Sequence, residues 1–397
     1  MISHRMIKMT EGGSAIRAMF EEGNRLAALY GRENVYDFSL GNPNIPAPEK
    51  IRSEILSIAG NTDPMALHGY MPNAGYPFVR KAVAESLNSR FGGAFGEDSI
   101  IMTVGAAGGL NIVLKTLLNP GDEVLTFAPY FLEYGNYVSN FDGVLKAVPA
   151  PAERGFQPDA EALFAAVTEK TKAVIINNPN NPTGVVYSED TVRALAAALG
   201  RAQEKFGNPI YIIADEPYRE LCYDGASVPW LPGFYDNTIV CYSWSKSLSL
   251  PGERIGYVAI SPKAEDAGLI FSAAVIANRI LGFVNAPALQ QRLVAACLEE
   301  KTDVAAYDAN RRALYNGLTQ AGFQCVYPSG AFYMWVKTPE EDRAFTQRAK
   351  KYNILLVPGS SFACPGYVRI AYCVSHDMII RSLPAFRKLA EEYGLTK

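Results

Sequence analysis

A lysine follows a short apolar stretch in the segment SWSKSLSLPGERIG, residues 243–256. A lysine at the end of a buried strand is partly desolvated, which lowers the pKa of its amine and makes it a nucleophile towards carbonyl groups. Ser243, Ser245 and Arg254 lie close to Lys246 in the sequence. Two hydroxyls and a guanidinium suit a phosphate dianion, because arginine can contact two phosphate oxygens at once. The segment therefore suggests a nucleophilic lysine beside a phosphate site, with a solvated surface lysine as the alternative.

Asp215 directly follows the apolar run IYIIA. A carboxylate at the buried end of a strand is costly unless it meets a positive or donating group. That group could be an arginine or a helix amide of the same chain, or a protonated ring nitrogen of a ligand. Tyr218, three residues later, could offer its hydroxyl to the same ligand.

Two further segments have the composition of ligand loops. GAAGG, residues 105–109, is expected between a strand and a helix, where backbone N–H groups favour phosphate, although a tight turn without a ligand is the simpler interpretation of this segment alone. It fits neither the dinucleotide fingerprint nor the P-loop. NPNNPTG, residues 178–184, contains two Asn-Pro steps and a Thr-Gly, which impose a rigid bend that can present Asn181 inward.

Strand-like and helix-like runs alternate through the first two thirds of the chain. The strand-like runs cover 100–104, 123–128, 173–178, 210–215 and 239–244, and the helical runs include 110–118 and 189–205. This order predicts an α/β fold with a mainly parallel, doubly wound sheet. Ligands bind at the carboxyl ends of the strands in such sheets. The four candidate segments follow four of these strands, so we expect them to meet at one edge.

The pattern changes after about residue 285. A long helical pattern over 286–320 is followed by three strand-like runs, at 332–336, 355–358 and 367–372, and by a closing helix at 376–393. Another helix is expected near the N-terminus, at 14–31. This α+β texture predicts a second, smaller domain. We expect a large domain over 40–285 and a small discontinuous domain made of 1–39 and 286–397.

Composition excludes several classes of function. The 397 residues are 49% hydrophobic, which is enough for a sizeable core, and 37 Lys and Arg against 40 Asp and Glu argue against binding to nucleic acid or to an anionic membrane surface. We see no membrane-spanning stretch and no secretory signal. The six cysteines are scattered and the three histidines lack metal-ligand spacing. We therefore expect reduced thiols, no metal site and a cytoplasmic location.

The motifs NPNNPTG, DEPY (215–218) and SWSKSLSLPGERIG stand in the same order as in a known enzyme family. The chain resembles, over nearly its whole length, the pyridoxal-phosphate-dependent aminotransferases of the aspartate aminotransferase type (class I/II, fold type I). The resemblance implies a transaminase of amino acid metabolism that uses pyridoxal 5′-phosphate. Such an enzyme moves an amino group between an L-amino acid and a 2-oxo acid by a ping-pong mechanism through aldimine and ketimine forms. It also implies a homodimer with shared active sites.

The resemblance assigns roles to the candidate residues. Lys246 matches the lysine that holds the cofactor as a Schiff base and moves the Cα proton, and Asp215 matches the residue that keeps the pyridine nitrogen protonated. Tyr218 and Asn181 match the contacts to the ring oxygen O3′. The remaining cofactor contacts are the phosphate ligands Gly105, Ala106, Ala107, Ser243 and Arg254, the stacking ring of Phe131, and Tyr70, which matches a tyrosine reaching the neighbouring subunit's phosphate.

The same resemblance assigns the residues that bind the substrate's α-carboxylate. Arg369, in VRIAY, matches the arginine that binds it, with help from Asn181 and the backbone of Gly41. Ala107 and Phe131 depart from the hydroxyl residue and the tryptophan that the aspartate enzymes often carry at these places.

The residue that would bind the far end of the substrate's side chain is less clearly indicated by the sequence. Aligning on Asn-Ala-Pro at 285–287 puts Ile280 where dicarboxylate-specific members carry an arginine, with Arg279 one residue away. A step of one residue turns a helical side chain by about 100°. Arg279 therefore either binds a distal carboxylate or is a surface arginine.

Two alternatives to a transaminase remain at this point. A lyase on the same scaffold, such as a C–S β-lyase or an aminocyclopropane-carboxylate synthase-like enzyme, would use the same cofactor residues, and the synthase group shares the Leu-Pro-Gly of SLSLPGERIG. A non-catalytic pyridoxal-binding regulator would carry a DNA-binding domain ahead of this fold, and the short segment before the first expected helix argues against it.

Overall fold

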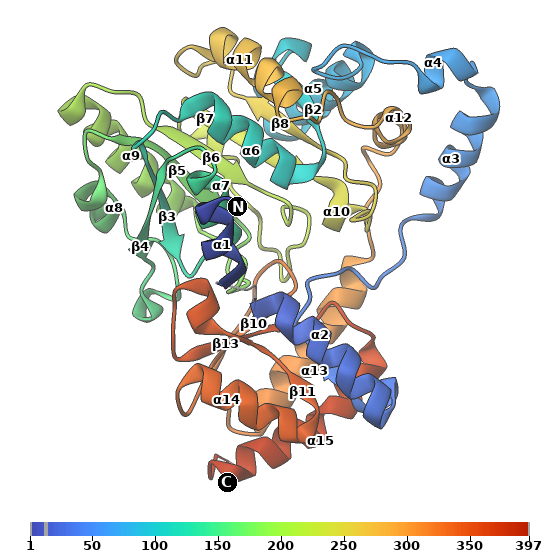
Figure 1. The fold of residues 1–397 in the computed structure, drawn as a ribbon, viewed down its shortest axis with the longest axis vertical. Coiled ribbons are helices and arrows are strands. Elements are labelled where there is room, and N and C mark those ends of the chain that lie inside the picture. Colours follow the sequence, from blue (N-terminus) through green and yellow to red (C-terminus); the bar gives the residue numbers. More distant parts are fainter. Residues whose placement is uncertain (1, 12–14, 396–397) are drawn as a thin grey trace.

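A seven-stranded sheet forms the centre of the larger part of the molecule in the computed structural model, which describes residues 2–11 and 15–395 (Figure 1). The strand order is β2-β8-β7-β6-β5-β3-β4. Only β8 runs antiparallel to its neighbours, so the α/β class with a mainly parallel sheet is confirmed. The strands are β2 Ile100–Thr103, β3 Glu123–Ala128, β4 Val144–Pro149, β5 Thr171–Asn177, β6 Tyr211–Asp215, β7 Thr238–Ser243 and β8 Gly256–Ile260.

Helices cover both faces of this sheet, which explains why its central strands are apolar throughout. Alternate residues of β5 pack into different cores: Val174 and Ile176 into one, Ala173 and Ile175 into the other. The first core is closed by α5 (Pro77–Phe91), α8 (Ala160–Ala166) and α9 (Glu189–Phe206). The second is closed by α6 (Gly105–Leu117), α7 (Glu133–Ser139) and α11 (Ala267–Ile280).

The smaller part contains a four-stranded antiparallel sheet, β12-β13-β10-β9, and a two-stranded parallel one, β1-β11. Figure 1 shows the C-terminus here, with α2 beside the C-terminal helices, whereas the N-terminal helix α1 (His4–Glu11) lies next to the larger part, where Arg5 pairs with Asp142. Its core joins Phe38 to Leu314 and Phe386. The elements are β1 Tyr36–Asp37, β9 Cys325–Val326, β10 Tyr333–Lys337, β11 Ile354–Leu355, β12 Val357–Pro358, β13 Tyr367–Ala371, α2 Ala15–Tyr30, α13 Val304–Gln320, α14 Asp342–Ala349 and α15 His376–Glu392.

The segment 286–320 differs from the expectation of one long helix. It forms α12 (Ala288–Ala296) and α13, with a break between them. Leu293 and Val294 of α12 join the core that contains α5, and α12 also contacts α3 (Glu49–Asn61) and α4 (Pro64–His68). The division into 40–285 and the two ends stays a prediction, and these contacts favour a boundary after α12.

One other local expectation is wrong, and two strands of the large sheet were not predicted. GAAGG is the first turn of α6 rather than a loop ahead of it. The strands β4 and β8 were not expected. β4 lies at the edge of the sheet with most of its side chains partly or fully exposed, so it lacks the apolar run that marks the other strands.

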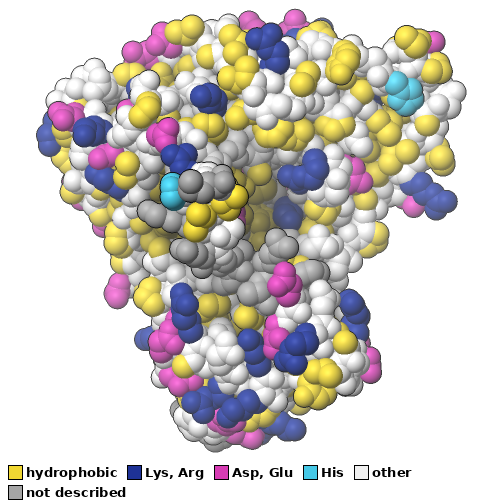
Figure 2. Space-filling view, in the orientation of Figure 1, with side chains coloured by type: hydrophobic (Ala, Val, Ile, Leu, Met, Phe, Trp, Pro, Cys, Tyr) yellow, Lys and Arg dark blue, Asp and Glu magenta, His cyan; other side chains and the backbone are white. Residues whose placement is uncertain are grey.

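The remaining helices are α1 (His4–Glu11) and the short α10 (Trp244–Ser247). No helix within 2–11 and 15–395 is both long and apolar enough to span a membrane. In the space-filling view a recess lies between the two parts, with hydrophobic side chains along it and Lys or Arg side chains at one edge (Figure 2).

Candidate active site

A cavity of about 310 Å³ lies at the carboxyl ends of β5, β6 and β7, next to strand β10 and β13 of the smaller part. This volume falls in the range of small-molecule sites. The structure brings together in its lining all of the predicted site residues except Gly105 and Tyr70. The lining comprises Gly41, Ala106, Ala107, Leu110, Phe131, Tyr137, Asn177, Asn181, Asp215, Pro217, Tyr218, Ser243, Ser245, Lys246, Pro251, Arg254, Tyr333 and Arg369.

Lys246 is carried by α10, a single turn that starts directly after β7. Ser243 caps this turn by accepting a hydrogen bond from the Ser245 amide at 3.2 Å. The Lys246 ammonium donates to the carbonyl of Gly41 at 2.7 Å. Burial lowers the pKa of Lys246 to about 8, and the nearby positive charge of Arg254 acts in the same direction. Near neutral pH a useful fraction of this amine is therefore unprotonated and nucleophilic.

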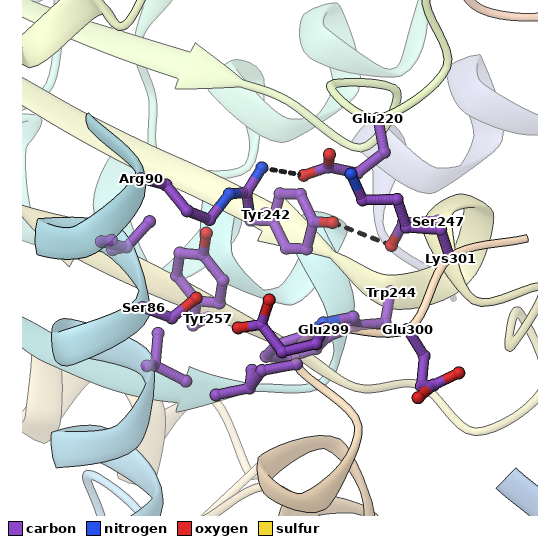
Figure 3. Close-up of a pocket in the computed structure, with 13 residues that line it drawn as sticks. Ser86, Arg90, Glu220, Tyr242, Trp244, Ser247, Tyr257, Glu299, Glu300 and Lys301 are labelled. Atoms are coloured by element: carbon purple, nitrogen blue, oxygen red, sulfur yellow. Dashed lines mark hydrogen bonds and ion pairs between the residues drawn. The ribbon is translucent and has the colours of Figure 1, made fainter. Parts of the chain in front are cut away.

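A second, smaller cavity of about 150 Å³ lies behind α10 (Figure 3). Its charged residues include Arg90 and Glu220, which form an ion pair at 2.5 Å. The Tyr242 hydroxyl donates to Ser247 Oγ at 2.8 Å, as the dashed line in Figure 3 shows. Because Ser247 follows Lys246, this bond fixes the back of the turn that carries the lysine. None of the predicted site residues lines this second cavity.

Asp215 is buried at the end of β6. The Tyr134 hydroxyl donates to its Oδ2 at 2.5 Å, whereas Oδ1 has no hydrogen-bond partner. Burial raises the pKa of Asp215 to about 7, and the Tyr134 hydrogen bond opposes that rise. A buried carboxylate oxygen with an unused lone pair is costly, so it fits a cationic donor in the cavity. The sequence did not point to Tyr134, which stands 81 positions from its partner.

Asn177 connects the two predicted ligand contacts Asp215 and Asn181. Its amide nitrogen donates to the Asp215 carbonyl at 2.8 Å, and its side-chain oxygen accepts from the Asn181 amide at 2.7 Å. This pair of bonds fixes the NPNNPTG bend against the end of β6. Sequence reasoning missed Asn177, although it immediately precedes that motif and ends an apolar strand.

Tyr218 and Tyr333 face each other across the cavity wall, with their hydroxyl oxygens 2.9 Å apart. Burial raises the pKa of Tyr218 well above its ordinary value, so the phenol is neutral and can donate. Tyr333, from β10, was predicted only as part of a strand, FYMWV. Its role in the site depends on the packing of β10 beside the large sheet, and the local sequence around Tyr333 does not indicate that packing.

Arg369 lies buried on β13. Its guanidinium donates to Asn181 Oδ1 at 3.1 Å and to the Ser39 carbonyl at 2.5 Å, while its Nε has no partner. The guanidinium carbon lies 4.6 Å from the ring centroid of Tyr333 and 4.9 Å from that of Phe362. A buried guanidinium that is held in place and still has a free donor suits a carboxylate ligand.

The opposite end of the cavity is built for an anion. Ser243 Oγ and Ser245 Oγ lie 2.6 Å apart, and Arg254 is 3.4 Å from Ser245 Oγ. The backbone of Ala106, in the first turn of α6, lies alongside. Gly105 has a φ of +78°, and a Cβ there would lie 2.8 Å from Arg254 Nη2, so this position requires glycine. A helix N-terminus, two hydroxyls and a guanidinium together suit a phosphate.

Tyr70 and the candidate distal-carboxylate residue Arg279 both lie away from this chain's cavity. Tyr70 is 93% exposed, and Arg279 is exposed on α11 without lining the cavity. Whether either acts on a second subunit stays a prediction. Within the part of the chain that the structure describes, no three His, Cys, Asp or Glu side chains form a group able to hold a metal ion.

Comparison with known proteins agrees with this geometry. The family model described as "Aminotransferase class I and II" matches residues 33–385. The probable aspartate/prephenate aminotransferase of Thermus aquaticus is 34% identical over 87% of this chain and 89% of its own length. The corresponding aspartate/prephenate aminotransferase of Thermus thermophilus is 32% identical over 88% of this chain and 89% of its own.

Solved structures give the same result. An amino transferase from Eubacterium rectale has a TM-score of 0.96 and 46% identity, with 99% of each chain covered. The aspartate aminotransferase of Thermus thermophilus with maleate has a TM-score of 0.83 and 28% identity, over 95% of this chain and 97% of that one. These relatives are aminotransferases, so the lyase alternative is not favoured. The chain belongs to the class I and II aminotransferases, a pyridoxal-phosphate-dependent family, and its reaction is transamination.

Proposed function

We propose that the cavity beside Lys246 binds pyridoxal 5′-phosphate and that the residues around it carry out the transfer between an L-amino acid and a 2-oxo acid. The observation that carries this proposal is the unpartnered, buried Oδ1 of Asp215. This oxygen has no hydrogen-bond partner in the protein, and a protonated pyridine nitrogen would supply one. The anion cradle near Arg254 adds independent support.

The residues present fit the cofactor. Arg254, Ser243 and Ser245 would hold its phosphate, together with the amides of Gly105, Ala106 and Ala107. Asp215 would pair with the ring nitrogen, Tyr218 and Asn181 would donate to the ring oxygen, and Phe131 would stack on the ring. When bound, the cofactor supplies an electron sink for the bond that breaks at the substrate Cα.

Lys246 is the base in this proposal. Its amine has a pKa of about 8 because of burial, so at cellular pH it can take up a proton and return it. The Gly41 carbonyl holds the amine at 2.7 Å and so limits its reach. We infer that Lys246 removes the proton from the substrate Cα and later delivers it to the cofactor carbon C4′.

Arg369 orients the substrate. Its guanidinium is fixed by Asn181 and Ser39, so the α-carboxylate of any amino acid or 2-oxo acid would be bound in one orientation. Holding a reactant in a single geometry is a large part of catalysis in such sites. Because both substrates of a transaminase carry this carboxylate, the same arginine would serve both half-reactions.

We also propose a homodimer with shared active sites. The loop that carries Tyr70 is anchored to the end of α11 and to the segment after it: Asn278 of α11 donates to the Asn73 carbonyl, Asn73 donates to the Val284 carbonyl, and Asn285 donates to the Met71 carbonyl. The Tyr70 side chain nevertheless projects into solvent. An exposed aromatic residue on an anchored loop supports contact with a second subunit.

The distal group of the substrate and the cellular location stay proposals. The cations that line the cavity are Lys246, Arg254 and Arg369, and all three have other roles here. A distal carboxylate would therefore need a cation from outside this lining, and Arg279 of a second subunit is the candidate. A cytoplasmic location is supported by the six cysteines, all of which are unpaired thiols.

A donor screen tests the proposed reaction. The purified enzyme with added cofactor is given alanine, aspartate, cysteine or methionine, each with and without a 2-oxo acid acceptor (2-oxoglutarate, pyruvate or oxaloacetate). We expect amino transfer that depends on the acceptor. Release of pyruvate or ammonia without any acceptor would contradict the proposed reaction.

A further inference from the structure

Tyr333 contacts the three groups that the proposed function uses most. Its hydroxyl oxygen lies 2.9 Å from that of Tyr218. The guanidinium carbon of Arg369 lies over its ring, 4.6 Å from the ring centroid. The third contact is Gly41, whose carbonyl holds Lys246. Tyr333 is 2% exposed and lines the cavity, so these contacts are shielded from bulk water.

The contact with Gly41 leaves no free space. A Cβ built at Gly41 would lie 2.1 Å from the Tyr333 hydroxyl oxygen and 3.0 Å from its ring carbon Cζ. The glycine is required here by this close approach, since no other side chain would fit beneath the tyrosine. The position of the Tyr333 hydroxyl is therefore determined by the backbone that also positions the lysine.

We propose that Tyr333 is a positioning residue that couples the carboxylate site to the cofactor site: its ring face supports Arg369, and its hydroxyl directs the hydroxyl of Tyr218. This inference rests on the proposed function, because it assigns Arg369 to the substrate carboxylate and Tyr218 to the cofactor ring oxygen. It adds a residue of the small sheet that links the two sites.

The ring face and the hydroxyl perform separable tasks. A cation over an aromatic ring is attracted by the ring's quadrupole, and the attraction grows when water is excluded. Phenylalanine keeps this face and removes the hydroxyl. Leucine removes both while retaining an apolar side chain. The pair Tyr333→Phe and Tyr333→Leu therefore distinguishes the two contributions.

The hydroxyl acts through Tyr218. Either oxygen of the pair can donate to the other. With an anionic ring oxygen in the cavity, the Tyr218 proton points to that oxygen and the Tyr333 proton points to Tyr218. A hydroxyl that accepts a hydrogen bond becomes a better donor. Removing the Tyr333 hydroxyl should therefore weaken the bond from Tyr218 to the cofactor and favour the protonated form of the bound cofactor.

The first measurement is the binding of carboxylates that cannot react. Maleate and 3-phenylpropionate are titrated into the holoenzyme, and the change in cofactor absorption gives the dissociation constant. We expect Tyr333→Leu to raise that constant by about 5- to 30-fold, the size of one partly desolvated cation–π contact, and Tyr333→Phe to change it less than about twofold. Equal losses in both variants, or no loss in Tyr333→Leu, would overturn the role of the ring.

The second measurement is the pH midpoint of the absorption change of the bound cofactor without substrate. In Tyr333→Phe we expect the midpoint to move up by about half a pH unit, the effect of one hydrogen bond. An unchanged or lower midpoint would overturn the role of the hydroxyl. Tyr333→Phe removes a single oxygen, so this arm remains decisive even if Tyr333→Leu does not fold.

Tyr223→Phe is the matched control. Tyr223 is a buried tyrosine of the same core, its hydroxyl donates to the Ala331 carbonyl at 2.5 Å, and it does not line the cavity. We expect Tyr223→Phe to have the wild-type dissociation constants for the two carboxylates and the wild-type pH midpoint of the cofactor's absorption change. If the wild-type protein neither binds the cofactor nor transfers amino groups, the proposed function itself is contradicted. If the wild type is active but the Tyr333 variants have the same carboxylate dissociation constants and the same pH midpoint as wild type, only this inference is contradicted.

Discussion

The Tyr134 hydroxyl holds one oxygen of Asp215 at 2.5 Å, and the other oxygen of that carboxylate has no partner in the protein. The two oxygens are therefore unequal: one is fixed, and the other is available to a ligand. Burial alone would favour the neutral acid, and the Tyr134 hydrogen bond stabilises the ionised form that a cationic ring nitrogen needs.

Replacing Tyr134 by phenylalanine should make Asp215 harder to ionise. The lost hydrogen bond raises the pKa of Asp215 beyond about 7 in the cofactor-free protein. We expect the acid limb of kcat/KM against pH to move up by about 0.5 to 1 unit, equivalent to about 1 kcal/mol for one hydrogen bond. Tyr130→Phe, next to Tyr134 in a stacked pair but without a bond to Asp215, is the control. Superimposable profiles for Tyr134→Phe and wild type would contradict this role.

Asp215→Asn should separate stability from activity. The folded-state pKa of Asp215 is about 7 against an ordinary 3.8, so the folded protein binds more protons across that window and loses stability as pH rises through it. The asparagine variant cannot ionise. We expect its cofactor-free form to unfold at a higher temperature than wild type at pH 8, with the difference shrinking towards pH 4, while kcat falls by about 100- to 1,000-fold. Calorimetry measures the unfolding temperature and steady-state kinetics measure kcat. A near-normal kcat would refute the proposed pairing of Asp215 with the cofactor's ring nitrogen.

Arg369→Lys should weaken both substrates together. Lysine keeps the charge but cannot reach Asn181 and Ser39 while presenting a paired donor to a carboxylate. We expect KM to rise about 10- to 100-fold for the amino acid and for the 2-oxo acid, with the absorption spectrum of the bound cofactor unchanged. A rise for one substrate only would mean that the arginine does not bind the shared α-carboxylate.

The open role of Arg279 is tested in the same assay. If Arg279 binds a distal carboxylate, Arg279→Ala raises KM for aspartate and leaves KM for alanine unchanged. Equal effects on both amino acids, or none, would assign Arg279 to the surface of α11, where it is exposed in the single chain.

Strand ends were the most predictable part of this site. Lys246, Asp215 and Asn181 could be inferred because each follows an apolar strand, and parallel strands bring their carboxyl ends to one edge. Gly105 was identified, but its place inside the first turn of α6 was not, because a glycine-rich sequence favours a loop when read locally.

Partners that act across the fold were not predictable. Tyr333 lies 115 positions from Tyr218, and Tyr134 lies 81 positions from Asp215. Their own neighbourhoods contain only ordinary strand and helix patterns, so their roles depend on how the two sheets and α7 pack. The break between α12 and α13 was missed although the sequence marks it: residues 299–303 are all polar, and Asp303 caps α13 by accepting a hydrogen bond from the Ala306 amide.

Shared active sites predict complementation between inactive subunits. Lys246→Ala removes the base from its own site, and Tyr70→Ala removes the residue that would reach the neighbour's site. A hybrid of the two has one site with both residues intact. We expect the mixed, refolded protein to recover up to about a quarter of wild-type activity, because half of the dimers are hybrids with one working site. If Tyr70 acted in its own subunit, the mixture would stay as inactive as its components.

The identity of the reactive amine is the central claim, and borohydride reduction followed by peptide mass spectrometry tests it most directly. The enzyme is incubated with pyridoxal 5′-phosphate, reduced, digested and mapped. Since the pKa of Lys246 is lowered to about 8 by burial, we expect one labelled lysine, Lys246, already labelled at pH 8, and no label in Lys246→Ala. Labelling of another lysine, or labelling that appears only near pH 10, would contradict the account.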